Sequence, residues 1–208
     1  MDTKYNASKN NVENKTTLCL FFFTCVCLLI PACATAPKEQ GPQTIEIIED
    51  YRVDSRDKED FNSAVDLLTQ HEYEKAIILL KKITENTKNL TAPYINLGMA
   101  YIRIDKLEDA EESLTKALKL NPNHPLAKNE MAVVYRKTGR FSQARVLYEE
   151  VLSAYPDFLP ARKNLGILCD LYLQDLQCAN KHYEIYSASN QDQKNMRIWL
   201  ADVKNRMK

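Results

Sequence analysis

"NLGMAYIRIDKLEDAEESLTKALKLNP" occupies residues 96–122, and "EMAVVYRKTGRFSQARVLYEEVLSAYP" occupies residues 130–156. The two stretches share a pattern of small, aromatic and aliphatic positions at a spacing of 34 residues, although most other positions differ. A repeat of this length is typical of stacked units and not of one folded shell around a catalytic cleft. The sequence therefore predicts an array of similar units.

The pattern extends to four copies. One set of small residues is spaced by 34 residues throughout and consists of Ala64, Gly98, Ala132 and Gly166. A second set, spaced by 34, 34 and 35 residues, consists of Ala76, Ala110, Ala144 and Ala179. Bulky residues keep the same phase one turn after the second set, namely Leu80, Leu114, Tyr148 and Tyr183. Small side chains let paired helices approach to about 8–9 Å, so we expect Gly98 to face Ala110 across a helical hairpin.

These units resemble tetratricopeptide repeats. The best copy shows every anchor of that family, namely Tyr94, Leu97, Gly98, Tyr101, Ala110, Leu114, Ala117 and Pro122. The resemblance implies an all-α fold, an α-solenoid in which helix-turn-helix repeats stack into a right-handed superhelix. The expected repeats are 57–90, 91–124, 125–158 and 159–193, and the fourth carries one extra residue in its turn near "YLQDLQ".

Residues 194–208 are expected to form a C-terminal capping helix. Apolar residues recur there at spacings of three and four, namely Met196, Trp199, Leu200, Val203 and Met207. Such a stripe would cover the open end of the fourth repeat while polar residues face water. A helix that binds a membrane surface or a partner is the alternative, because the segment also carries Trp199 and several basic residues.

The first part of the chain has a different character. An apolar run from Leu18 to Ile30 would span roughly 20 Å as a helix, which is short of a bilayer core of roughly 30 Å. We therefore predict a signal peptide at residues 1–32, followed by a flexible tether at 33–56. "LIPAC" resembles the lipobox of bacterial lipoproteins, which implies lipidation of Cys33. Cleavage after Ala36 and an uncleaved anchor are the alternatives.

The lipoprotein resemblance also implies a location. Ala34 follows Cys33, where retention in the inner membrane would require aspartate, so the implied site is the inner leaflet of the bacterial outer membrane, facing the periplasm. In that oxidising compartment Cys169 and Cys178 could form a disulfide. Two buried free thiols remain the other possibility.

Nothing in the sequence predicts an enzyme. The formal net charge is zero, which gives no reason to expect a nucleic-acid partner. The four glycines are too scattered for a phosphate-binding loop, and His71, His124 and His182 lie more than fifty residues apart. We therefore expect no catalytic residues, no metal, no cofactor and no small-molecule substrate.

The resemblance implies that the first helices of the repeats line a concave groove. The predicted groove residues are Ile95, Met99, Ile102, Arg103, Asn129, Val133, Arg136, Lys137, Lys163 and Ile167. An aliphatic strip with basic edges would suit a peptide or helix with apolar anchors and acidic flanks. The basic residues could equally form a solvated rim. Met99, Val133 and Ile167 replace the asparagine of carboxylate-clamp members of the family, so capture of a free C-terminus is not implied.

These features together predict a non-enzymatic adaptor that is anchored in the envelope and binds a partner polypeptide. Lipoproteins with this layout resemble two groups, one assisting pilus secretin assembly and the other accompanying TonB-ExbB-ExbD energy-transduction clusters. An accessory subunit of a cell-wall enzyme and a self-associating scaffold are the alternative functions.

Overall fold

The computed structural model describes residues 55–189 and 194–208. All of them belong to the second of two compact units, Gly41–Lys208. The expected signal peptide, Cys33 and nearly all of the expected tether lie outside the described residues. Among the helices that are described, none combines the length and the apolar character needed to cross a membrane.

The described residues form nine α-helices and one π-helical turn, and no strand. In chain order they are α1 (Ser55–Thr69), α2 (Tyr73–Asn86), α3 (Thr91–Arg103), α4 (Leu107–Leu120), α5 (Pro125–Lys137), α6 (Phe141–Ala154), α7 (Leu159–Leu168), the π turn η1 (Cys169–Leu173), α8 (Leu176–Ser189) and α9 (Lys194–Arg206). The prediction of an all-α fold is confirmed.

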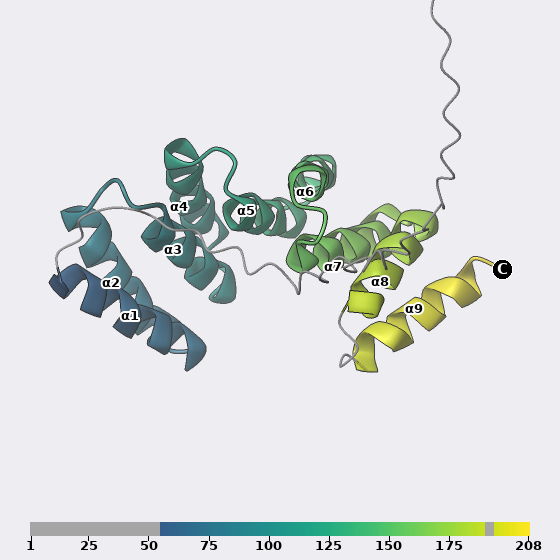
Figure 1. The fold of residues 1–208 in the computed structure, drawn as a ribbon, viewed down its shortest axis with the longest axis horizontal. Coiled ribbons are helices and arrows are strands. Elements are labelled where there is room, and N and C mark those ends of the chain that lie inside the picture. The colour runs from purple at the N-terminus through teal and green to yellow at the C-terminus, as the bar shows by residue number, and fades with distance from the viewer. Residues whose placement is uncertain (1–54, 190–193) are drawn as a thin grey trace, which may run out of the picture. The chain divides into compact units, whose positions relative to one another are not determined.

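The helices pack in pairs as helix-turn-helix repeats (Figure 1). Each of the first helices α1, α3, α5 and α7 packs against the second helix that follows it, and each second helix packs against the next first helix. Successive first helices also contact one another directly, from α1 to α3, α3 to α5 and α5 to α7. The first helices therefore form a continuous layer.

Prolines help to define where three of the first helices begin. Pro93, Pro125 and Pro160 lie in the first turns of α3, α5 and α7. A missing backbone N–H is harmless there, because the first N–H groups of a helix have no intrahelical partner. The Nδ1 atom of His124 also accepts a hydrogen bond from the Ala127 N–H at 3.3 Å, which caps α5.

The small residues allow close contact between the helices of each pair. A Cβ atom added to Gly98 would lie 2.5 Å from the Leu114 Cγ atom, and one added to Gly166 would lie 2.5 Å from the Tyr183 Cε1 atom. The atoms nearest to Gly98 therefore belong to Leu114, one turn beyond the expected neighbour Ala110. Ala110 itself is completely buried, so both small positions contribute to the close packing.

The turns between paired helices repeat one backbone conformation. His71, Asp105, Gly139 and Gln174 all have positive φ, with values of 63°, 61°, 80° and 55°. The spacings between these residues are 34, 34 and 35, so the turn keeps the phase of the repeats. The extra residue of the fourth repeat does not lengthen this turn. The extra residue is accommodated in the π turn that precedes Gln174. There the Asp175 N–H donates a hydrogen bond to the Cys169 carbonyl.

Helix α9 packs against α8, as α7 packs against α6. Its side chains Met196 and Val203 are 1% and 0% exposed and belong to the core cluster that includes the fourth repeat. Two polar contacts hold the helix in place, from Arg206 to Asp170 and from Lys204 to Glu184. Trp199 lies 6.1 Å from Tyr183 between ring centroids and is 40% exposed.

Candidate functional site

The layer of first helices presents an aliphatic strip. Met99 on α3, Val133 on α5 and Ile167 on α7 occupy equivalent positions at spacings of 34 residues, and each is half-buried. Ile102 is half-buried in the same way. We call the surface of these four residues and the basic residues beside them the first-helix face.

The structure separates the predicted groove residues into two groups. Ile95 and Asn129 are only 2% and 1% exposed, so they support the surface from beneath and offer a partner little contact area. Arg103 and Lys137 are exposed, whereas Arg136 and Lys163 are half-buried. Eight of the ten predicted groove residues therefore reach the surface, and the two buried ones are each the fifth residue of their helix.

A ladder of polar side chains links α5 to α7. Asn164 Nδ2 donates to Asn129 Oδ1 at 3.1 Å, and Asn129 Nδ2 donates to Glu130 Oε1 at 2.8 Å. Burial raises the pKa of Glu130, while the hydrogen bond from Asn129 and the charges of Arg103 and Arg136 oppose that rise. Glu130 and Asn164 were not among the predicted site residues. The two occupy the same repeat position, where Asn62 and Asn96 stand in the first two repeats, so the recurring asparagine could have marked Asn164, whereas Glu130 departs from the pattern.

Arg136 is held by an aromatic residue from the fourth repeat. Its Nη1 atom donates to the Tyr172 hydroxyl at 3.2 Å, and its guanidinium carbon lies 5.5 Å from the Tyr172 ring centroid. Tyr172 also packs against Phe141, with ring centroids 5.0 Å apart. The extra residue of the fourth repeat marked this segment as irregular, but nothing in the sequence placed Tyr172 beside Arg136.

The basic residues of the first-helix face differ in their ion pairing. Lys137 Nζ lies 2.8 Å from Asp105 Oδ1, so its charge is balanced within the array. Between residues 55–189 and 194–208, no carboxylate forms an ion pair with Arg103, Arg136 or Lys163. No ion pair among the described residues therefore balances the charges of these three side chains, although Arg136 donates a hydrogen bond to Tyr172.

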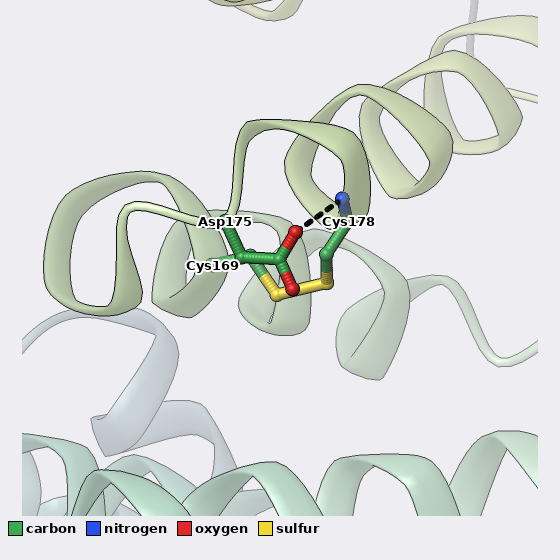
Figure 2. Close-up of side chains that lie close together, drawn as sticks. All are labelled: Cys169, Asp175 and Cys178. Carbon is green, nitrogen blue, oxygen red and sulfur yellow. Dashed lines mark hydrogen bonds between the residues drawn. A yellow bond between two sulfur atoms is a disulfide. The ribbon is translucent and has the colours of Figure 1, made fainter.

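Cys169 and Cys178 form a disulfide in the structure, which joins η1 to the first turn of α8 (Figure 2). Asp175 lies next to them and its Oδ1 atom accepts from the Cys178 N–H at 3.0 Å. The two sulfurs and an Asp175 oxygen lie within 4.8 Å of one another. Sulfurs bonded to each other cannot serve as thiolate ligands. In its oxidised form this cluster is therefore a structural cross-link.

The histidines occupy separate structural positions. His71 Nδ1 lies 2.8 Å from the Tyr73 hydroxyl, and His124 caps α5. His182 on α8 is 8% exposed, and burial lowers its pKa to about 4. In the described part of the chain, none of the three belongs to a cluster that could hold a metal ion.

Comparison with known proteins agrees with this architecture. Residues 105–166 match the tetratricopeptide repeat family. The probable UDP-N-acetylglucosamine–peptide N-acetylglucosaminyltransferase SPINDLY of Solanum lycopersicum is 36% identical over 112 residues, which cover 54% of this chain but only 12% of that protein. The match therefore concerns a small part of a much longer relative.

Two solved structures have a similar fold. MamA from Desulfovibrio magneticus RS-1 has a TM-score of 0.63 and 23% identity, over 74% of this chain and 86% of that one. PilF from Pseudomonas aeruginosa has a TM-score of 0.66 and 18% identity, over 73% of this chain and 68% of that one. At these identities the likeness shows a shared fold of helical repeats.

Proposed function

We propose that this chain is a non-enzymatic adaptor that is anchored to a membrane and binds a partner polypeptide on its first-helix face. The observation that carries the proposal is the aliphatic strip, in which Met99, Val133 and Ile167 are half-buried at equivalent positions of three adjacent first helices. Partly exposed apolar side chains that are aligned and bordered by charge suit a surface that binds another polypeptide.

The residue chemistry supports binding and not catalysis. Burial keeps the pKa of His182 near 4, so this side chain is neutral and a weak base at neutral pH. Cys169 and Cys178 are joined to each other and cannot act as nucleophiles in that state. The first-helix face offers aliphatic and cationic groups, which suit an extended or helical segment that has apolar anchors and acidic flanks.

The proposal places the array at the inner leaflet of the bacterial outer membrane, facing the periplasm. Lipidation at Cys33 supplies the membrane anchor. Residues 33–56 serve as a flexible tether that spans the distance between the membrane and the repeats. The partner would belong to an envelope complex, either a pilus secretin or a TonB-type energy-transduction system. Replacement of Cys33 by Ser, followed by palmitate labelling and fractionation of cells, tests the anchor independently of the face.

Site-directed crosslinking tests the binding surface. A photoreactive amino acid is introduced at Met99, Val133 or Ile167 in the full-length protein, and crosslinked products are identified by mass spectrometry in intact cells. Ile78 on α2 and Lys119 on α4 are exposed positions on second helices and serve as controls. One recurrent product from all three strip positions, and not from the controls, is the expected result. Products that arise only from Ile78 and Lys119 would show that the partner binds elsewhere.

A further inference from the structure

Helix α9 has the register of a fifth first helix. Leu200 and Ala201 follow Leu165 and Gly166 by 35 residues, which is the spacing that the extra residue of the fourth repeat imposes. Val203 keeps the same register, because it is fully buried like its equivalents Ala100, Val134 and Leu168. Among residues 55–189 and 194–208, no second helix follows α9. The helix is therefore the first half of a repeat that the described residues leave incomplete.

The side of α9 that would contact a second helix is open. In the four complete repeats, the small residue at the position of Ala201 is always buried, namely Ala64, Gly98, Ala132 and Gly166. Ala201 itself is exposed. Leu200 is only half-buried, although the equivalent residues Leu97, Met131 and Leu165 are buried. We call the surface of Leu200 and Ala201 the open face of α9.

The complete repeats show what covers such a face. The second helices α2, α4, α6 and α8 are each 14 residues long. Each has alanine at its fourth position and a bulky residue at its first and eighth positions. The eighth residue covers the small residue of the first helix, since the atoms nearest to an added Cβ belong to Leu114 at Gly98 and to Tyr183 at Gly166. An amphipathic helix with this pattern therefore fits over Ala201.

Alanine is compatible with this packing. The third repeat has Ala132 at the position of Ala201 and Tyr148 at the eighth position of its second helix, and both side chains are 0% exposed. A bulky residue can thus be buried in a repeat whose first helix carries alanine instead of glycine. The alanine of α9 does not prevent a second helix from binding.

The charge of α9 indicates which kind of helix binds. Residues 194–208 contain five basic residues and one acidic residue. The third repeat shows how charge is matched at this kind of interface, because Lys128 Nζ on α5 lies 2.7 Å from Glu150 Oε2 on α6. Arg197 occupies the position of Lys128 on α9. An acidic helix complements this surface, whereas α9 of a second copy would bring like charges together.

The open face differs from both the first-helix face and a membrane-binding surface. Asp202 occupies the position of the aliphatic strip and pairs with Arg206, so the strip does not extend onto α9. Ile198 and Met207 are exposed but lie nine positions, or about two and a half helical turns, apart. They therefore point to opposite sides, whereas a helix that lies in a membrane surface gathers its apolar residues on one side.

We propose that α9 binds an acidic amphipathic helix of a partner protein, which completes a fifth helix-turn-helix repeat. The partner helix places a bulky side chain over Ala201, as Leu114 covers Gly98, and its carboxylates face the basic residues of α9. The binding energy comes from the same packing that joins the two helices of every complete repeat. The inference uses a surface separate from the first-helix face and does not depend on the proposed function.

A synthetic second helix tests the open face. The probe is a fluorescein-labelled peptide of residues 107–122, which contains α4 and carries four acidic and two basic residues. Fluorescence anisotropy measures its binding to the full-length wild type and to the Ala201→Glu and Ala201→Lys variants. We expect each substitution to weaken binding about tenfold. Either side chain would occupy the space that the bulky residue at the eighth position needs.

Three controls make the result specific. A probe with Leu114→Asp lacks the bulky side chain at the eighth position and should bind the wild type about tenfold more weakly. Val146→Glu introduces the same carboxylate at an exposed position of α6 and should leave binding unchanged. The Met99→Asp, Val133→Asp double variant alters the first-helix face and should bind the probe normally. Circular dichroism melts verify the fold of each variant.

The outcomes that overturn the inference are distinct. No binding of the probe, or equal affinity for the wild type and both Ala201 variants, would show that the open face does not accept a second helix. Weaker binding to Ala201→Glu alone would indicate charge attraction without packing. A wild-type dimer in sedimentation that becomes monomeric in both variants would identify a second copy as the occupant. Displacement of the probe by phosphatidylglycerol vesicles would identify a lipid surface instead.

Discussion

The second and fourth repeats pair their helices through the same kind of contact but connect them differently. In both, a glycine of the first helix packs against a bulky residue of the second, Gly98 against Leu114 and Gly166 against Tyr183. The second repeat has a regular turn at Asp105, whereas the fourth ends its first helix in a π turn that a disulfide closes. The helix pairing is thus independent of how the helices are joined, since it depends on residues in mid-helix.

The largest expected loss of unfolding free energy comes from replacing the mid-helix glycines, and it should be similar in both repeats. Gly98→Val and Gly166→Val would each introduce a branched side chain where even a single Cβ atom would lie 2.5 Å from a buried neighbour. Overpacking of this kind destabilises a protein by about 3 kcal/mol. Urea denaturation followed by circular dichroism measures the change for both variants. If one glycine tolerates valine with no change in midpoint, the two repeats do not share the contact.

The disulfide should contribute to the stability of the fourth repeat and not to that of the other repeats. Cys169 and Cys178 are nine positions apart, and a cross-link that closes so short a loop stabilises by about 2–3 kcal/mol. We expect the Cys169→Ala, Cys178→Ala variant to lose that amount. Reduction of the wild type should produce a similar loss. Hydrogen exchange should rise in η1 and α8 while α3 and α4 stay protected, and a uniform rise over all repeats would contradict a local role.

His182 makes the stability of the fourth repeat depend on pH. Burial lowers its pKa to about 4, with smaller contributions from Arg162 and Lys181, whereas the unfolded chain takes up this proton near pH 6.5. The stabilisation is therefore complete above pH 6.5 and is lost as the pH falls toward 4. The loss between pH 7 and 4.5 should be about 2 kcal/mol.

The third repeat supplies a matched control for that measurement. Leu147 occupies the position equivalent to His182, so His182→Leu copies a side chain that the array already accommodates. The difference in unfolding free energy between wild type and variant should change with pH by about 2 kcal/mol. A constant difference from pH 7 to 4.5 would show that His182 does not titrate as expected.

The smallest change in unfolding free energy is expected from substitution of Gly139 in the turn of the third repeat. Gly139 has φ of 80° and no atom within 4 Å of an added Cβ, while the equivalent turns use His71 and Asp105 in the same conformation. Gly139→Asn should therefore change the unfolding free energy by less than about 1 kcal/mol, because asparagine tolerates left-handed backbone. Thermal melts of this variant beside Gly139→Val, which should be clearly less stable, test the shared turn geometry.

The repeat spacing predicted the helical architecture well because it reflects packing that every unit must satisfy. Ala64, Gly98, Ala132 and Gly166 could be aligned by eye, and the helix pairs follow from them. The sequence did not show which bulky residue of the second helix contacts Gly98. Gly98 contacts Leu114 most closely because helical side chains extend over the neighbouring turn, so a residue's Cα position alone does not show what it covers.

The candidate site was only partly predictable. The half-buried strip of Met99, Val133 and Ile167 follows from the repeat register, but the surroundings of Arg136 do not. Tyr172 reaches it from the irregular π turn, and Glu130 depends on the amide of Asn129. Such contacts join residues that repeat nowhere else in the chain. A pattern that is defined by recurrence cannot reveal them.

The positive-φ turns also bear on the order in which the array assembles. A left-handed backbone costs a β-carbon residue about 1 kcal/mol more than glycine, and Gly139 is the only glycine among the four equivalent turn residues. Among the four hairpins, the turn between α5 and α6 therefore has the lowest backbone conformational free energy. We expect the folding nucleus to form there, with the outer hairpins condensing onto it from both sides.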